Sequence, residues 1–436
     1  MRQVLACNLM ERVLASDNLN QAYLRVKKNK GAAGVDGMSI SEALEYLRLH
    51  GTSLRESLRE GRYRPQPVRS VEIPKPRGGT RKLGIPTVVD RIIQQALLQV
   101  LQPILDTTFS CSSFGYRPSK SAHDAVLHMQ DCVKRGHDWV VDVDLESFFD
   151  TVNHDILMRL LSEKIGDKSV LRLIRRYLQA GLMKHGVCSR SEQGVPQGGP
   201  LSPLLSNVLL NEADRELERR GHLFCRYADD VQVYVKSREA GERILKSLTE
   251  YFARTLHLKV NEVKSDCKPV SGAIYLGYGC SADGFLLLPE ASYKRLQRKL
   301  RSLTKRRRGG SFERIVSELN RVLIGWCNYF RYARCRQHVS RMDKWLRRRL
   351  RCLRLSRCKR VHTVKKFLTK QGVPSWRSWL LALSGKGWWR MSGTPQANEA
   401  MPIKWFSEQG LVSLLERYTL LQTLEEPPYT QVRTVV

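Results

Sequence analysis

Apolar residues recur at helical spacing along most of the chain before residue 291, with short strand-like alternating runs between them. Helices are predicted at 41–51, 88–105, 121–136, 155–165, 206–221 and 240–256. Strands are predicted at 69–75, 139–145 and 223–236, and the last contains a tight turn near Tyr227. Such a turn joins antiparallel strands, so the pattern predicts an α+β domain with a largely antiparallel sheet.

After residue 291 the pattern becomes helical throughout. Apolar residues keep helical spacing over 293–310, 311–333 and 339–356, with breaks at Gly309-Gly310 and near Arg336. This region predicts a three-helix bundle. Two further pieces, the Trp-rich 375–391 and the segment 403–418, predict a small final domain followed by a loose tail.

Charge changes this picture by indicating a partner. Lysine and arginine outnumber acids 74 to 42, giving a formal charge of +32, and a surface with that excess favours a polyanion such as nucleic acid. Residues 291–370 hold 27 Lys and Arg against 3 acids, so the helical bundle carries most of the excess. Charge for solubility alone and a membrane surface are the competing interpretations.

The N-terminal residues and the cysteines indicate in which cellular compartment the protein is expected. The first residues lack a signal-peptide core and cleavage site, and nowhere do eighteen apolar residues run together, so a soluble, cytoplasmic protein without a membrane partner is expected. The 11 cysteines form no C-x-x-C pair, which argues against a disulfide framework and a zinc site.

Carboxylates at two places indicate chemistry. Asp229-Asp230 would sit at a hairpin tip, where an Asp-Asp turn taken alone is common in proteins of any function. Alternation places Asp142 and Asp144 on one face of a strand, with Asp150 further on, although one of them could be an ordinary cap or ion-pair partner. Nucleotidyl transfer uses two divalent ions held by hard oxygen ligands, and carboxylates converging from two strands fit that requirement.

Six ordered blocks resemble the reverse transcriptase and maturase proteins of bacterial group II introns. They are KNKGAAGVDG (28–37), VEIPKPRGGTRKLGIPTVVDRIIQQAL (71–97), SSFGYRPSKSAHDAV (112–126), VDVDLESFFDTVNHDIL (141–157), GVPQGGPLSPLLSNVLLNEAD (194–214) and RYADD (226–230). The resemblance covers nearly the whole chain. It implies an α+β right-hand polymerase with fingers, a palm carrying an antiparallel sheet, a helical thumb and a small C-terminal helical domain.

The resemblance also assigns roles to residues. Asp144, Asp229 and Asp230 match the catalytic aspartates, which would hold two magnesium ions. Lys75 and Arg81 match residues of the fingers that clamp the incoming triphosphate, tasks suited to an ammonium and a guanidinium. Their alternative is ordinary surface charge.

Further nucleotide contacts follow from three more matches. Phe149 matches the aromatic residue that rejects ribonucleotides at the sugar C2′, although its neighbour Phe148 could be the gate instead. Gln197 matches a glutamine near the incoming nucleotide. Lys264 matches the lysine after an asparagine, but this chain has Val263-Lys264-Ser265 where the family commonly has Glu-Lys-Thr.

The basic bundle resembles the thumb, or maturase region, through GWCNYFRYA at 325–333. Its aromatic residues are expected in the core, whereas two arginine clusters are expected to bind RNA. These are Arg306, Arg307, Arg308, Arg347, Arg348 and Arg349. Residues 386–418 resemble the DNA-binding domain of family members that lack a nuclease, so no DNA-cleaving activity is expected.

The implied boundaries are N-terminal extension and fingers, 1–100; remaining fingers and palm, 101–285; thumb, 286–370; DNA-binding domain, 371–420; tail, 421–436. The implied function is RNA-directed DNA polymerase, copying RNA into cDNA and binding group II intron RNA to promote splicing and mobility. Partners would include RNA template and primer, deoxynucleoside triphosphates and target DNA, with nucleoid association when DNA is bound. Alternatives are a domesticated relative in DNA repair or phage defence, a splicing-only maturase and RNA-dependent RNA synthesis, which the aromatic gate disfavours.

Overall fold

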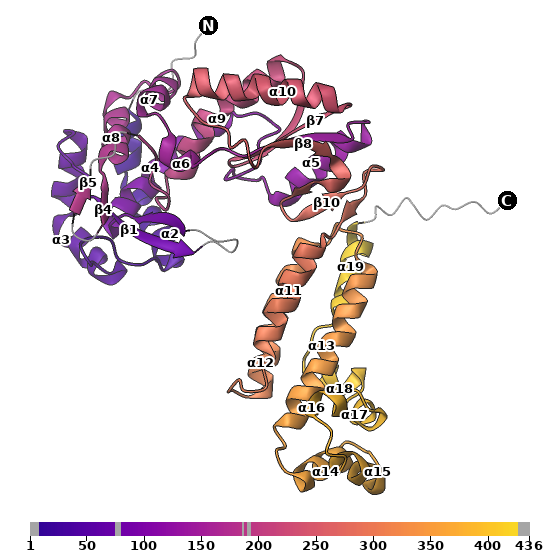
Figure 1. Ribbon diagram of the computed structural model, residues 1–436. Helices are drawn as coiled ribbons and strands as arrows, with labels where there is room; N and C mark the ends of the chain where they lie inside the picture. The colour runs from indigo at the N-terminus through magenta and orange to yellow at the C-terminus, as the bar shows by residue number, and fades with distance from the viewer. Residues whose placement is uncertain (1–7, 75–79, 185–186, 190–192, 426–436) are drawn as a thin grey trace. The chain divides into compact units, whose positions relative to one another are not determined.

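The structure is a computed structural model that describes residues 8–74, 80–184, 187–189 and 193–425 (Figure 1). The chain divides into two compact units, residues 1–270 and 271–436. Each unit has its own buried apolar residues and is described separately below.

The N-terminal unit combines helices with two sheets. Its helices are α1 (Leu9–Leu14), α2 (Ser16–Asn29), α3 (Ile40–Arg59), α4 (Val88–Asp106), α5 (Ala122–Lys134), α6 (Phe148–Thr151), α7 (His154–Ser162), α8 (Lys168–Gln179), α9 (Ser202–Arg219) and α10 (Arg238–Tyr251). Each predicted helix is present, although α3 ends eight residues beyond the predicted 41–51. Helices α1, α2, α6 and α8 were not predicted. In α8, Val170, Leu173, Ile174 and Tyr177 are buried at helical spacing.

One sheet is entirely antiparallel, as predicted. It has the order β6-β7-β3-β8, with β3 at Trp139–Val143, β6 at Leu223–Tyr227, β7 at Asp230–Val235 and β8 at Asp266–Pro269. Helix α10 packs on β3, β7 and β8, while α5 and α9 pack on β6. Gly241 of α10 packs against Val141, because a Cβ at Gly241 would lie 3.2 Å from the Val141 side chain. Side chains alternate along a strand, so Asp142 points to the face away from α10.

The second sheet is mixed and was only partly predicted. Its order is β2-β1-β4-β5, with β1 at Val68–Pro74, β2 at Thr80–Ile85, β4 at Leu182–Lys184 and β5 at Val187–Ser189. Strands β1 and β2 are antiparallel, whereas β1 and β4 are parallel. The short β4 and β5 carry little alternation, which is why pattern alone did not indicate them.

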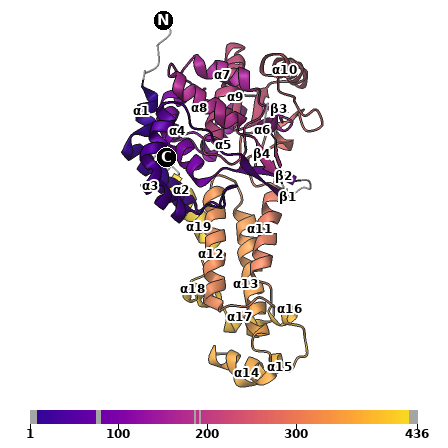
Figure 2. The ribbon, with the colours of Figure 1, turned by 90° about the vertical axis from the view of Figure 1, so that its left-hand side faces the viewer.

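The C-terminal unit is helical apart from a small sheet. Its strands are β9 (Ile274–Tyr275), β10 (Tyr278–Cys280) and β11 (Leu286–Leu287). Its helices are α11 (Glu290–Leu303), α12 (Phe312–Tyr329), α13 (Arg336–Ser356), α14 (Val361–Lys370), α15 (Ser375–Ala382), α16 (Trp388–Met391), α17 (Pro395–Ala400), α18 (Ile403–Glu408) and α19 (Leu414–Glu425). The three predicted bundle helices are α11, α12 and α13, which run side by side (Figure 2).

Helix α19 returns from the end of the chain and packs against α12 and α13. The buried carboxylate of Asp343 accepts hydrogen bonds from the N–H groups of Leu414 and Leu415, which begin this helix. The Tyr418 hydroxyl donates to the Ala333 carbonyl at 2.8 Å. The structure therefore places residues 371–420 in one unit with the bundle, and residues 421–425, expected in the tail, are helical.

Candidate active site

Asp229 and Asp230 lie at the tight turn between β6 and β7. Tyr227 pairs with Asp230, so Ala228 and Asp229 alone form the turn. Ala228 has a φ of 59°. Both common types of two-residue hairpin turn, I′ and II′, require a positive φ at the first of the two turn residues. The turn therefore places the two adjacent carboxylates at the end of the antiparallel sheet.

A buried arginine, Arg226, contacts the backbone of this turn. Arg226 is 0% exposed, and its guanidinium donates to both carboxylate oxygens of Asp214, at 2.7 and 2.6 Å. It also donates to the Ala228 carbonyl at 3.0 Å. Burial raises the pKa of Asp214, and the guanidinium beside it opposes that shift. The ion pair thus ties helix α9 to the backbone of the turn.

Gly115 closes the other side of the turn. A Cβ at this position would stand 2.3 Å from the backbone nitrogen of Ala228, so only glycine fits. The Asn207 side chain donates to the Gly115 carbonyl at 2.9 Å and accepts from Arg226 at 2.9 Å. Gly115 and Arg226 together fix where Asp229 and Asp230 stand.

Asp144 directly follows β3 and is held by residues 261–265. Its backbone N–H donates to the Ser265 hydroxyl at 2.9 Å, and its carbonyl accepts from the Asn261 N–H at 2.8 Å. The ammonium of Lys264 contacts the Asp144 carboxylate at 2.9 Å. Lys264, predicted to contact the nucleotide, therefore lies on Asp144, and it does not line the cavity described below.

Asp142 has a different setting from Asp144. Its carboxylate pairs with Lys268 at 3.2 Å, and Lys268 also pairs with Asp266 at 2.9 Å. Burial raises the pKa of Asp142, and the charge of Lys268 opposes this rise. Asp142 therefore contributes negative charge near the site while its own carboxylate is engaged.

The carboxylates influence one another electrostatically. Burial, and then the charges of Asp229, Asp142 and Asp144, raise the pKa of Asp230 to about 6. A bound cation would relieve the repulsion between these carboxylates, and carboxylate oxygens are the ligands that a hard divalent cation prefers. The side chains of Asp144, Asp229 and Asp230 therefore fit magnesium. Within the described residues, however, no three acidic, histidine or cysteine side chains are already arranged around a metal position. In this conformation the Lys264 ammonium engages Asp144 instead.

A cavity of about 480 Å³ adjoins the turn, and Asp229, Phe149, Gln197 and Arg91 are among its lining residues. Its size falls in the range of pockets that take small ligands. Phe148 is 3% exposed in the core, whereas the neighbouring Phe149 lines the cavity. The predicted residues Asp229, Phe149 and Gln197 are therefore brought together at one cavity.

Backbone packing positions Gln197 within this wall. Its carbonyl accepts from the Gly84 N–H of β2 at 2.7 Å. Gly198 has a φ of 126°, and a Cβ there would lie 2.4 Å from the Gly84 carbonyl oxygen. This loop thus needs glycine because it crosses the strand at backbone contact.

Of the two predicted triphosphate ligands, Lys75 lies outside the described residues, and so does the side chain of Arg81, whose backbone belongs to β2. Arg91, a 9% exposed cation that lines the cavity, was not predicted. One of its nitrogens donates to the Ala32 carbonyl at 2.5 Å, while the buried Nε has no hydrogen-bond partner in the described part of the chain. An arginine inside the apolar helical run 88–105 was the available signal.

The six arginines predicted to bind RNA lie in the C-terminal unit in different settings. Arg306 and Arg307 are exposed, and Arg347 is half-buried on α13. Arg308 pairs with Glu318, which lowers the pKa of that carboxyl. The remaining two contact their own unit: Arg348 stacks on Trp389, and Arg349 donates to Thr304.

No helix in the described ranges combines the length and apolar character needed to cross a bilayer.

Two family models match the chain. Residues 73–280 match reverse transcriptase (RNA-dependent DNA polymerase), and residues 293–372 match the group II intron maturase-specific domain. The first match contains Asp144, Asp229 and Asp230, and the second contains α11 from residue 293 onward and the whole of α12, α13 and α14.

Individual proteins are similar over shorter spans. Protein YkfC of Escherichia coli is 33% identical over 311 residues, covering 62% of this chain and 82% of YkfC. The group II intron-encoded protein LtrA of Lactococcus lactis is 33% identical over 265 residues, covering 60% of this chain and 40% of LtrA. A chain of the partial Cas6-RT-Cas1–Cas2 complex is 26% identical with a TM-score of 0.38, covering 57% of this chain and 43% of that one, a likeness too slight to bear on function. The chain thus spans most of YkfC but less than half of LtrA.

The α+β fold, the carboxylates at the hairpin turn and these matches agree with one another. The chain belongs to the family of group II intron-encoded reverse transcriptases and maturases, which are RNA-directed DNA polymerases.

Proposed function

We propose that this chain copies an RNA template into DNA by two-metal nucleotidyl transfer, with Asp144, Asp229 and Asp230 as the magnesium ligands. The observation that carries the proposal is that Asp229 lines a cavity of about 480 Å³, while the charges of Asp229 and Asp144 act on Asp230 beside it. Bound magnesium would activate the primer 3′ hydroxyl and stabilise the leaving pyrophosphate.

The residues of the chain would do the positioning. Arg226 and Gly115 hold the turn, so Asp229 and Asp230 keep their places while a substrate binds. Phe149 on the cavity wall would crowd a ribose 2′ hydroxyl and so favour deoxynucleotides. Gln197 would contact the incoming nucleotide, and Arg91, a cation that lines the same cavity, would contact its phosphates.

Lys264 would change partners during the cycle. It neutralises Asp144 in the present conformation, and a cation bound by Asp144 would replace it there. The released ammonium could then contact the triphosphate, together with Lys75 and Arg81 of the fingers.

We also propose that the chain binds its group II intron RNA and promotes splicing. The maturase-specific match and the excess of cations over 291–370 support this second role. Target DNA is a further proposed partner of residues 371–420, on the strength of their sequence resemblance. Splicing should depend on the basic surface and should not need Asp229.

Primer extension on an RNA template tests the polymerase directly. The assay supplies magnesium and deoxynucleotides, and compares the wild type with Asp229→Asn and with Asp266→Asn. Asp266 is a matched control because it is an exposed carboxylate on the same sheet. We expect Asp229→Asn to lose synthesis by at least about a thousandfold, since a metal ligand contributes several kcal/mol to the transition state. Equal activity in all three proteins would refute the assigned site.

Two parallel arms sharpen the result. Ribonucleotides in place of deoxynucleotides should support little extension by the wild type. An intron-splicing assay with Asp229→Asn should proceed normally if the RNA-binding role is separate. A folded wild type that splices intron RNA but extends no primer would favour the splicing-only alternative.

A further inference from the structure

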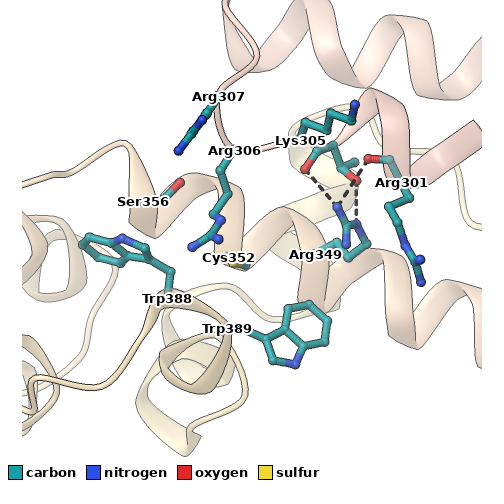
Figure 3. Close-up of a pocket in the computed structure, with 10 residues that line it drawn as sticks. Arg301, Lys305, Arg306, Arg307, Arg349, Cys352, Ser356, Trp388 and Trp389 are labelled. Carbon is teal, nitrogen blue, oxygen red and sulfur yellow. Dashed lines mark hydrogen bonds between the residues drawn. The ribbon is translucent and has the colours of Figure 1, made fainter. Parts of the chain in front are cut away.

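A second cavity lies wholly within the C-terminal unit. It has a volume of about 870 Å³ and is bordered by α11, the turn that follows it, α13 and α16 (Figure 3). Its lining is basic and aromatic: Arg301, Thr304, Lys305, Arg306, Arg307, Arg349, Cys352, Ser356, Trp388 and Trp389. This combination of side chains is not used by the polymerase site.

The charge of this lining has no compensation from within. Five cations border the cavity, and among the described residues no carboxylate belongs to its lining. Nearby Arg308 shows the contrast, because Glu318 pairs with it and it is not part of the lining. Cations gathered around a concave surface repel one another, so the cavity favours an anion.

Arg349 is fixed in the wall by its own unit. Its Nε donates to the Thr304 hydroxyl at 2.6 Å, and Nη2 donates to the Thr304 carbonyl at 3.2 Å (Figure 3). The side chain is thus held at the wall before any ligand arrives. Arg306 and Arg307, by contrast, are exposed and extend from the turn after α11 toward the cavity (Figure 3).

The two indoles differ in what covers them. The Arg348 guanidinium lies 4.3 Å from the centre of the Trp389 ring, so one face of that ring is occupied. Trp388 is half-buried, and in the described part of the chain no other ring or cation stacks on it. Trp388 therefore offers a flat apolar surface at the edge of a cationic cavity.

The other side chains of this cavity do not indicate a nucleophilic or metal-binding site. Burial raises the pKa of the Cys352 thiol, which makes it a poor nucleophile. No metal-ligating cluster occurs among the described residues.

We propose that this cavity takes one unstacked nucleotide of a single-stranded nucleic acid, with its base on Trp388 and its phosphates at Arg306, Arg307 and Arg349. A flat base and a flanking anion are what an indole beside arginines recognises. The inference rests on the nucleic-acid binding proposed above, and it adds a site, a ligand unit and the residues that hold it.

The test measures equilibrium binding of a fluorescent 12-nucleotide uridine RNA to the full chain, without magnesium or deoxynucleotides. A second RNA of equal length keeps every phosphate but lacks all bases. Trp388→Ala should weaken binding of the uridine RNA by roughly tenfold, the loss of one stacked base, and leave the baseless RNA unaffected. Trp376→Ala is the matched control, because Trp376 is 66% exposed on α15 outside the cavity.

The phosphate half of the proposal has its own readout. Arg306→Ala should make the negative slope of log affinity against log salt less steep by about 0.7, the value for one phosphate of a single strand. Arg298→Ala, which removes an exposed arginine of α11 outside the lining, should leave the slope unchanged. Trp388→Phe should retain binding, and it separates lost stacking from lost folding if Trp388→Ala melts early.

The outcomes are distinct. Equal losses for Trp388→Ala and Trp376→Ala, or a Trp388 effect on the baseless RNA, would overturn the stacking site. A free mononucleotide that binds at Trp388 as tightly as the RNA would overturn the strand-bound ligand. Single-stranded DNA of the same length distinguishes the sugar, and binding of either strand at Trp388 supports the site. Primer extension is measured separately, so failure of the polymerase proposal leaves this result standing.

Discussion

The acidic site of the N-terminal unit and the basic cavity of the C-terminal unit use charge in opposite ways. Two carboxylates of the acidic site have protein partners, Lys264 on Asp144 and Lys268 on Asp142, and the turn beside them rests on the ion pair of Arg226 with Asp214. The cavity has five cations, and no acid of the described chain lines it. The first site is thus partly neutralised by the protein, and burial and the remaining negative charge raise the pKa of Asp230, whereas the second site depends on a ligand for neutralisation.

The two regions also differ in how far the sequence predicts them. Asp144, Asp229 and Asp230 lie in two of the short blocks that resemble the family, and alternation along the sequence is enough to place them at strand ends. The basic region is indicated only by composition, which cannot tell Arg306 from Arg308. The two arginines differ because Arg308 forms an ion pair with Glu318 of α12.

Long-range contacts explain what the sequence could not show. Arg226 and Asp214 cannot be recognised as a pair in the sequence, because a strand and a helix must meet to join them. The return of α19 onto α12 and α13 likewise depends on Asp343, about seventy residues before the helix that it caps. Periodicity predicts which residues of an element are buried but not which element covers them.

The largest expected effect separates two neighbouring carboxylates of the acidic site. Asp144→Asn should reduce DNA synthesis by at least about a thousandfold, because it removes a proposed metal ligand. Asp142→Asn should reduce it far less, since Asp142 is not a proposed metal ligand and its carboxylate pairs with Lys268. Single-nucleotide incorporation rates at saturating magnesium compare the two. Equal losses would show that Asp142 is also a ligand.

The buried ion pair beneath the turn should dominate stability. Arg226→Met would leave the Asp214 carboxylate buried without a counter-charge, which costs about 3–5 kcal/mol of unfolding free energy. The double variant Arg226→Met with Asp214→Leu should recover much of that loss, because no charge stays buried. Denaturant titration of the full chain measures both. A double variant as unstable as the single one would show that the charge was not the cause.

The turn itself can be displaced without touching a carboxylate. Gly115→Ala forces a Cβ to within 2.3 Å of the Ala228 nitrogen, so the backbone at Asp229 must move. A displacement of about 1 Å costs roughly a hundredfold in rate, and RNA affinity should stay unchanged. Gly51→Ala is the control, because its Cβ meets nothing within 4 Å. Similar activity in both variants would mean that the turn absorbs the strain.

The smallest effect distinguishes two adjacent arginines of the basic region. Arg307→Ala should make the negative salt slope of RNA binding less steep by about 0.7, because Arg307 lines the cavity and is available to a phosphate. Arg308→Ala should leave that slope unchanged and slightly lower the melting temperature, since its guanidinium is held by Glu318 and the Leu303 carbonyl. If both arginines changed the slope equally, RNA would be drawn by overall charge and the cavity would have no special part. A slope that changes only with Arg307 would show that ion pairing within the protein decides which cations of a basic chain reach its ligand.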